Sequence, residues 1–195
     1  FKQKTAYEIS TRDWSSDVCS SDLAWHAESK ARKNNYAKML EQSCGGAPGP
    51  ATEAEYRHRS PLFHLAAAKN VPLDINTGIH DGHTGSVPVS HSLRAFNALA
   101  APEKQISAAD IDFMVQEQKV PDALAAESQA DPERQKAVLF RRTSGNARVT
   151  VFEGGHDSES SAGVLWLSRQ RKGRAADWSL GQAARTASSA QEVSK

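Results

Sequence analysis

The stretch Val71-Pro-Leu-Asp-Ile-Asn-Thr-Gly-Ile-His-Asp-Gly82 decides the fold class of this chain. Residues 71–77 alternate apolar and polar side chains, which predicts a β-strand with one apolar face, and a glycine-containing loop follows. A central parallel strand would instead be apolar throughout. Residues 148–152 form a second strand pattern and lead into Glu153-Gly-Gly-His-Asp157. The chain therefore has two predicted strands that each run directly into a loop with acidic and histidine side chains.

Helical patterns separate and flank these two strands. A composition of Ala, Lys, Glu and Arg favours one helix near the start of the chain, and Gly45-Gly-Ala-Pro-Gly-Pro50 ends it. Apolar residues at helical spacing predict three more helices, one of which opens with a capping Ser107. The predicted helices cover 24–42, 90–101, 107–118 and 162–171. Alternating strands and helices predict an α/β fold with a mostly parallel sheet flanked by helices.

Two further segments complete this prediction. Residues 137–141 predict a short strand, joined to 148–152 by a turn at Thr143-Ser-Gly-Asn146. Residues 121–132 are polar and rich in alanine, which predicts an exposed insertion. The domain is thus expected to cover 24–172.

The two ends of the chain differ in composition from this domain. Lys2 to Ile9 and Asp13 to Leu23 resemble the conceptual translation of a DNA sequencing-library adapter, so residues 1–23 are interpreted as non-native. Residues 173–195 contain few large apolar side chains, which predicts a disordered tail. We therefore expect the native chain to begin upstream, with any signal sequence, anchor or further domain outside this sequence.

Composition excludes some classes of function. The chain has 24 Lys and Arg against 23 Asp and Glu, a balance that gives no field attracting nucleic acid. No apolar run approaches the roughly 18 residues that span a bilayer. Outside the adapter-like segment, Cys44 is the single cysteine, so an internal disulfide is not expected there.

The two loops after the strands contain the residues of chemical interest. Ligands of α/β sheets bind at the carboxyl ends of strands, where Asp81 and His156 lie in this prediction. A serine hydrolase needs a carboxylate to fix the histidine tautomer, and a histidine to take up and return the serine proton. The order acid then histidine is the order of α/β-hydrolases. Asp81 and His156 are therefore the candidate catalytic residues.

Several short motifs resemble the end of a prolyl-oligopeptidase-like catalytic domain, an α/β-hydrolase. They are Tyr56-Arg-His-Arg-Ser-Pro-Leu62, Val71-Pro-Leu73, Gly78-Ile-His-Asp81, Val87-Pro88 and Phe152-Glu-Gly-Gly-His156. The resemblance covers roughly residues 24–171 and implies that Asp81 is the triad acid and His156 the general base. Val87-Pro88 lies several residues further from Asp81 than in most members. The resemblance implies a peptide or ester substrate and no cofactor.

The nucleophile of this family lies in Gly-x-Ser-x-Gly, and the sequence contains no such motif. Ser60, Ser86 and Ser144 all lack the two flanking glycines. We therefore expect the chain to be the C-terminal part of a serine peptidase, inactive by itself, whose serine lies upstream. A truncated sheet would also leave an unpaired strand edge that favours aggregation.

Other interpretations of the same residues remain open. The site could belong to an esterase of the same fold, or to a non-catalytic domain in which Asp81 and His156 only bind each other. A metal site could use a set of ligand-type side chains, namely His80, Asp81, His83, His91, His156 and Asp157. Arg57 and Arg59 could bind a substrate carboxylate or form surface ion pairs. Trp25, Trp166 and Trp178 are expected to serve in packing.

Overall fold

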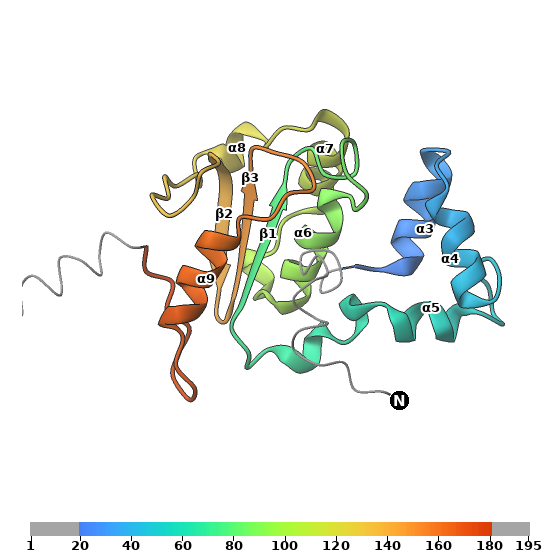
Figure 1. Ribbon diagram of the computed structural model, residues 1–195, viewed down its shortest axis with the longest axis horizontal. Coiled ribbons are helices and arrows are strands. Elements are labelled where there is room, and N and C mark those ends of the chain that lie inside the picture. Colours follow the sequence, from blue (N-terminus) through green and yellow to red (C-terminus); the bar gives the residue numbers. More distant parts are fainter. Residues whose placement is uncertain (1–19, 181–195) are drawn as a thin grey trace, which may run out of the picture.

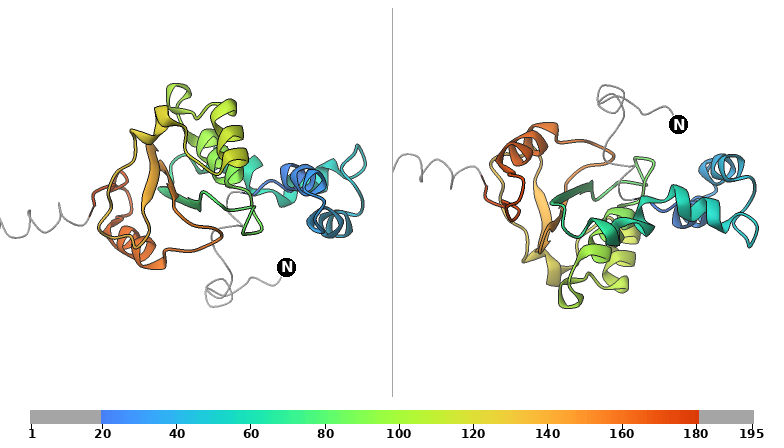
Figure 2. Two further views of the ribbon diagram at one scale, coloured as in Figure 1. Left: turned by 90° about the horizontal axis from the view of Figure 1, so that it is seen from above. Right: turned by 90° about the horizontal axis from the view of Figure 1, so that it is seen from below.

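A small mixed sheet lies between two layers of helices in the computed structural model, which describes residues 20–180 (Figures 1 and 2). The sheet has the strand order β1-β3-β2, with β1 at Leu73–Gly78, β2 at Val138–Ser144 and β3 at Ala147–Phe152. Strand β1 is parallel to β3, whereas β2 is antiparallel to it. The fold is therefore mixed α/β, and one of the two strand pairings in the described residues is parallel.

The hairpin between β2 and β3 accounts for the antiparallel pairing. Its turn is short, and Gly145 adopts φ +56, a left-handed conformation that glycine reaches without strain. Both predicted strands are confirmed, but β2 continues beyond the expected residue 141 to Ser144, so the turn is confined to Gly145-Asn146 instead of the predicted 143–146. A crossover through helices joins β1 to the hairpin, which allows β1 and β3 to run parallel.

One face of the sheet is apolar and packs against α6 (Val89–Leu99) and α7 (Ala108–Glu117). The strand register places Ile75 beside Val149 on this face, as the alternating pattern of β1 predicts. The Ser107 side chain accepts a hydrogen bond from the backbone N–H of Asp110, so the predicted N-cap of α7 is confirmed. The core of the domain lies between these helices and the sheet. Its fully buried large side chains include Leu93, Phe96, Met114, Phe140 and Val151.

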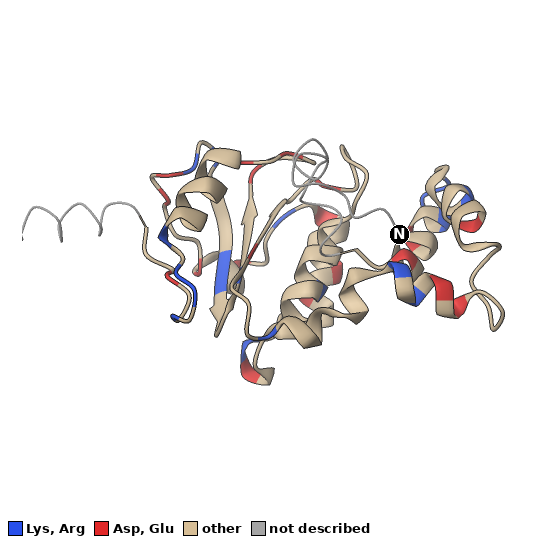
Figure 3. Ribbon diagram, turned by 60° about the horizontal axis from the view of Figure 1, so that its bottom comes forward, with Lys and Arg blue, Asp and Glu red and all other residues tan. Residues whose placement is uncertain are grey.

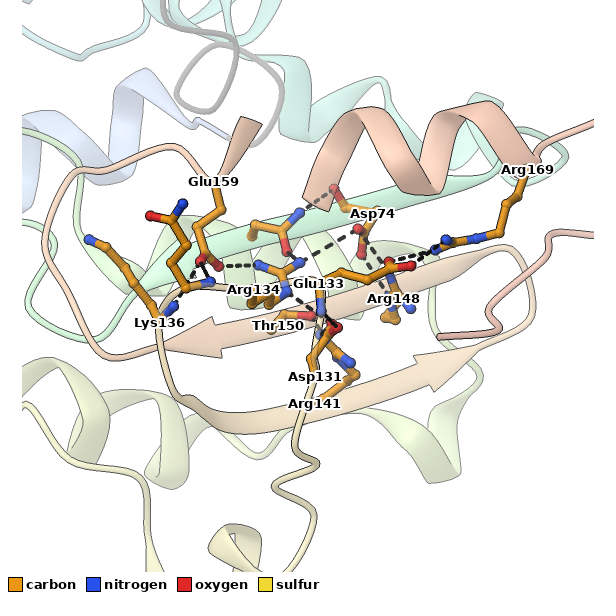
Figure 4. A network of polar contacts seen from close by, with 12 residues as sticks. Asp74, Asp131, Glu133, Arg134, Lys136, Arg141, Arg148, Thr150, Glu159 and Arg169 are labelled. Carbon is orange, nitrogen blue, oxygen red and sulfur yellow. Dashed lines mark hydrogen bonds and ion pairs between the residues drawn. The ribbon is translucent and has the colours of Figure 1, made fainter. Parts of the chain in front are cut away.

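The opposite face of the sheet is lined with buried charged side chains and is covered by residues 131–136 and by α9 (Ser160–Arg169) (Figure 4). Here Arg148 of β3 binds Asp74 of β1, and Arg141 of β2 donates to Thr150 of β3. Most of the predicted insertion 121–132 is exposed, and it contains the short helix α8 (Asp122–Ala125). Asp131 is an exception, because its carboxylate is buried in the ion pairs of this face.

The single helix predicted at 24–42 is instead two helices, α3 (Asp22–Ala31) and α4 (Tyr36–Cys44). The break follows from Lys33, which has φ 55, and from the two asparagines after it, which are weak helix formers. These helices and α5 (Glu53–Arg59) form an arm beside the sheet, in which acidic and basic residues are interspersed (Figure 3). A small cluster of Leu40, Cys44 and Tyr56 holds the arm together.

Short 3-10 helices connect the larger elements, at Pro61–Phe63, Leu65–Ala68 and Pro102–Lys104. No helix within residues 20–180 is long and apolar enough to cross a membrane. Of the segment interpreted as adapter-derived, Ser20 to Leu23 are described, and Asp22 begins α3. Residues 1–19 lie outside the described residues.

The end of the described chain has no regular secondary structure, yet it contacts the domain. Trp178 stacks on Trp166 of α9 with 5.5 Å between ring centroids, and its indole lies against Arg148. Both rings therefore serve in packing, and so does Trp25, whose ring lies 5.2 Å from that of Tyr36. The rest of the predicted tail, 181–195, lies outside the described residues.

Candidate catalytic site

Asp81 and His156 lie together although 75 positions separate them in the sequence. The parallel pairing of β1 with β3 continues past the strand ends, because Ile79 N–H donates to Phe152 O at 3.0 Å and His80 N–H donates to Gly154 O at 2.9 Å. The loops that follow are thereby kept side by side. His156 Nδ1 and Asp81 Oδ2 are 2.9 Å apart, within hydrogen-bonding distance.

The carboxylate of Asp81 is held from several sides. Burial raises the pKa of Asp81, although hydrogen bonds and charge from His156 and the backbone N–H groups of Gly82 and Val87 oppose that rise. The Gly82 N–H lies 2.8 Å from Oδ1. The backbone N–H of Val87, at the far end of the longer loop, acts on the same carboxylate. The extra residues that separate Val87-Pro88 from Asp81 therefore do not prevent this contact.

The hydrogen bond determines which nitrogen of His156 is basic. A carboxylate only accepts, so Nδ1 carries the proton and Nε2 is the nitrogen that can take up another. The His156 side chain is 21% exposed and that of Asp81 is 10% exposed. The histidine side chain is thus partly exposed beside a nearly buried acid, as a general base that meets a substrate requires.

Gly85 belongs to this site, although no pattern in the sequence singles it out. A Cβ atom at Gly85 would lie 2.3 Å from His156 Cβ and 2.5 Å from Asp81 Oδ1. The loop between Asp81 and Val87 therefore passes directly over the acid–histidine pair, and any side chain at this position would push the pair apart.

Gly78 sets the close approach of the two loops, so Gly78→Ala is expected to destabilise the fold by about 3 kcal/mol. An added Cβ would lie 2.2 Å from Gly155 O and 2.3 Å from Gly154 O, both backbone atoms that cannot rotate away. Gly163→Ala in α9 is the control, because its Cβ meets nothing within 4 Å, and we expect it to gain up to about 1 kcal/mol. Urea denaturation measures the free energy of unfolding of both variants. A loss below about 1 kcal/mol in Gly78→Ala would contradict the close packing of Gly78 against the backbone of Gly154 and Gly155.

The other histidines of the two loops bind partners of their own. His80 lies between Glu153 Oε1, at 2.7 Å from its Nε2, and Gln118 Oε1, at 3.0 Å from its Nδ1. His83 Nε2 lies 2.7 Å from the carbonyl oxygen of Val115. His91 is buried in α6. Within residues 20–180 no three His, Cys, Asp or Glu side chains converge on a point that could hold a metal ion.

The remaining candidates from the sequence have structural contacts elsewhere. Arg57 pairs with Glu53 at 2.8 Å and Arg59 with Asp22 at 3.3 Å, so both are engaged in ion pairs. Ser60 donates to Tyr56 O at 2.6 Å and is fully buried, which makes it unsuited to attack a substrate.

Comparisons of the chain with protein-family models, with curated proteins and with solved structures find no match. The assignment of a function therefore rests on the geometry and chemistry of the Asp81–His156 pair.

Proposed function

We propose that Asp81 and His156 are the acid and the general base of a serine hydrolase, acting on peptide bonds by acyl transfer. The observation that supports this most directly is the 2.9 Å contact between His156 Nδ1 and Asp81 Oδ2, at the carboxyl ends of two parallel strands. The order of the two residues in the chain and the short motifs around them favour an α/β-hydrolase resembling the prolyl-oligopeptidase family.

In this proposal each residue has a defined step. Asp81 holds the proton on Nδ1 and stabilises the imidazolium that forms. His156 Nε2 removes the proton from a serine hydroxyl as the serine oxygen attacks the carbonyl carbon, and the same proton then passes to the leaving amine. In the second half of the reaction, His156 Nε2 takes a proton from a water molecule as the water oxygen attacks the acyl-enzyme. That proton then passes to the serine oxygen, which releases the carboxylic acid and restores the serine.

The serine and the oxyanion hole are assigned to a part of the parent protein that this sequence does not include, because the sequence has no Gly-x-Ser-x-Gly. The 195-residue chain is accordingly expected to be inactive. An esterase of the same fold would use the same two residues in the same roles, so ester hydrolysis is the alternative that the site supports.

The proposal is tested by recovering the intact parent gene and treating the purified protein with a fluorophosphonate probe, which labels activated serines. We expect labelling of the wild-type parent, loss of labelling in His156→Ala, and no labelling of the 195-residue chain. Peptide and ester substrates assayed in parallel distinguish the peptidase from the esterase. A folded wild-type parent that is not labelled would exclude a serine hydrolase.

A further inference from the structure

Residues 131–136, here called the strap, cross the polar face of the sheet and contact the loop that bears His156 (Figure 4). The guanidinium of Arg134 donates to Glu159 Oε2 at 2.7 Å, and both side chains are at most 6% exposed. The other oxygen of Glu159 accepts from the backbone N–H groups of Gln135 and Lys136, each at 3.0 Å. The strap thus holds Glu159, three positions after His156, through three hydrogen bonds.

A second contact lies closer to His156. Lys136 Nζ forms an ion pair with Asp157, and its ammonium group lies 5.3 Å from the centroid of the Phe152 ring. The hydrogen bond from Lys136 and the backbone N–H of Gly155 lower the pKa of Asp157. Asp157, the residue directly after His156, therefore contacts both the strap and Gly155, the residue directly before His156.

The strap is itself fixed to the sheet, so it can serve as a rigid support. Asp131 accepts from Arg141 Nη2 of β2 at 2.6 Å and from Arg134 Nε at 3.3 Å. Burial alone would raise the pKa of Asp131, but hydrogen bonds from Arg141 and from the backbone N–H of Glu133, together with the charges of Arg141 and Arg134, outweigh it, and the pKa is lowered. At the far end of α9, Arg169 binds both oxygens of Glu133 at 2.7 and 3.0 Å.

We propose that Arg134 and Lys136 are positioning residues for His156. The loop 153–159 follows Phe152, the last residue of β3. On one side of this loop Asp81 contacts the imidazole of His156, and Gly85 lies against the Cβ of His156. On the other side, Asp157 and Glu159 of the loop contact the strap. Holding Asp157 and Glu159 fixes where the loop returns to α9, and this keeps Nδ1 directed at Asp81. The importance of this arrangement for catalysis rests on the proposed function, whereas the positioning itself does not.

The test uses the 195-residue chain labelled with ¹⁵N-histidine, because NMR reports the tautomer of His156 without any nucleophile. In the wild type we expect the neutral ring to carry its proton on Nδ1, and we expect Asp81→Asn to abolish this preference. Lys136→Met keeps the aliphatic stem over Phe152 and removes the ion pair. Arg134→Met removes the contacts to Glu159 and Asp131. Both are expected to increase the Nε2–H tautomer and to speed exchange of the Nδ1 proton with water about tenfold.

Arg142→Met is the matched control, since Arg142 lies in β2, which directly follows the strap, but pairs with Glu127, away from the His156 loop. Each variant is compared at an equal interval below its own Tm, so that loss of global stability does not count as loss of positioning. Should Arg134→Met not fold, Lys136→Met still decides, because the Lys136 side chain is 32% exposed and that of Asp157 is 50% exposed.

The possible results separate the two proposals. The positioning role would be overturned if the strap variants equal the control. That is, Lys136→Met and any folded Arg134→Met would show the same His156 tautomer and the same exchange rate as Arg142→Met. This holds even if the parent protein is labelled by a fluorophosphonate. Altered values in the strap variants would support the positioning role, even if the parent is not labelled and the proposed hydrolase function fails.

Discussion

Under the proposed hydrolase function, Asp81→Asn in a parent protein that carries the nucleophile is expected to lower kcat by about 10⁴, with little change in the thermal midpoint. Asparagine has the size of aspartate and still accepts a hydrogen bond from the backbone N–H of Gly82. Its amide group can also donate to Nδ1 of His156, which places the imidazole proton on Nε2. A histidine in that tautomer cannot take the proton from serine. Steady-state hydrolysis of an activated ester, compared at equal active-site concentration, measures the loss.

A matched control separates this effect from a general loss of a carboxylate. Asp110→Asn removes the charge of a residue in the N-cap of α7, where the Asp110 carboxylate accepts a hydrogen bond from Ser107. This position lies away from Asp81 and His156. We expect it to leave kcat within about twofold of the wild type, because the backbone N–H of residue 110 still donates to Ser107. A fall in kcat of less than tenfold in Asp81→Asn would show that Asp81 does not orient the general base.

The sequence could predict that Asp81 and His156 lie at the same edge of the sheet. Each residue follows a β-strand pattern, and the carboxyl ends of parallel neighbouring strands meet at one edge of a sheet. What the pattern left undetermined was the contact itself, which depends on Gly78 leaving room for the opposite backbone and on Gly85 leaving room for Asp81 and the Cβ of His156. Glycines in a loop are consistent with many turns, so their spatial neighbours could not be derived.

Long-range contacts account for what the sequence did not reveal about the strap. Asp131 and Arg134 read as polar residues of an exposed insertion or its edge, since isolated charges are costly to bury. Their burial becomes understandable only once β1, β2 and β3 bring Asp74, Arg141 and Arg148 to one face. The break at Lys33 was missed for a related reason, because Lys and Ala favour helix locally and the left-handed turn is stabilised by contacts such as Ser29 with the backbone N–H of Ala37.

The face of the sheet that carries these charges leads to the second large prediction: Asp74→Ala should destabilise the chain by about 3–5 kcal/mol. Arg148 donates to both oxygens of Asp74, at 2.8 and 2.9 Å, and the two side chains are 4% and 2% exposed. Removing the carboxylate leaves Arg148 buried beside Arg134 and Arg141 with one fewer acid to neutralise them. The loss of stability is that of leaving a buried cation unpaired, and it exceeds the net stabilisation that the ion pair provides.

Urea denaturation of the 195-residue chain measures this effect, and an exposed ion pair provides the control. Glu53→Ala breaks the pair with Arg57 on α5, where both side chains are about half exposed, and we expect it to cost no more than about 0.5 kcal/mol. The double variant Asp74→Leu with Arg148→Met removes both charges and fills the space with apolar atoms. It should recover most of the loss, because the desolvation penalty disappears together with the attraction.

The comparison of single and double variants decides what this buried network contributes. If Asp74→Ala and the double variant are equally unstable, then specific hydrogen bonds to Asp74, rather than an unpaired charge, hold the face together. If the single variant costs less than about 1 kcal/mol, water must reach Arg148, and the polar face is not sealed by α9 and the strap. A large loss in the single variant and recovery in the double one would establish that the unpaired charge of Arg148, rather than the lost hydrogen bonds, accounts for the destabilisation.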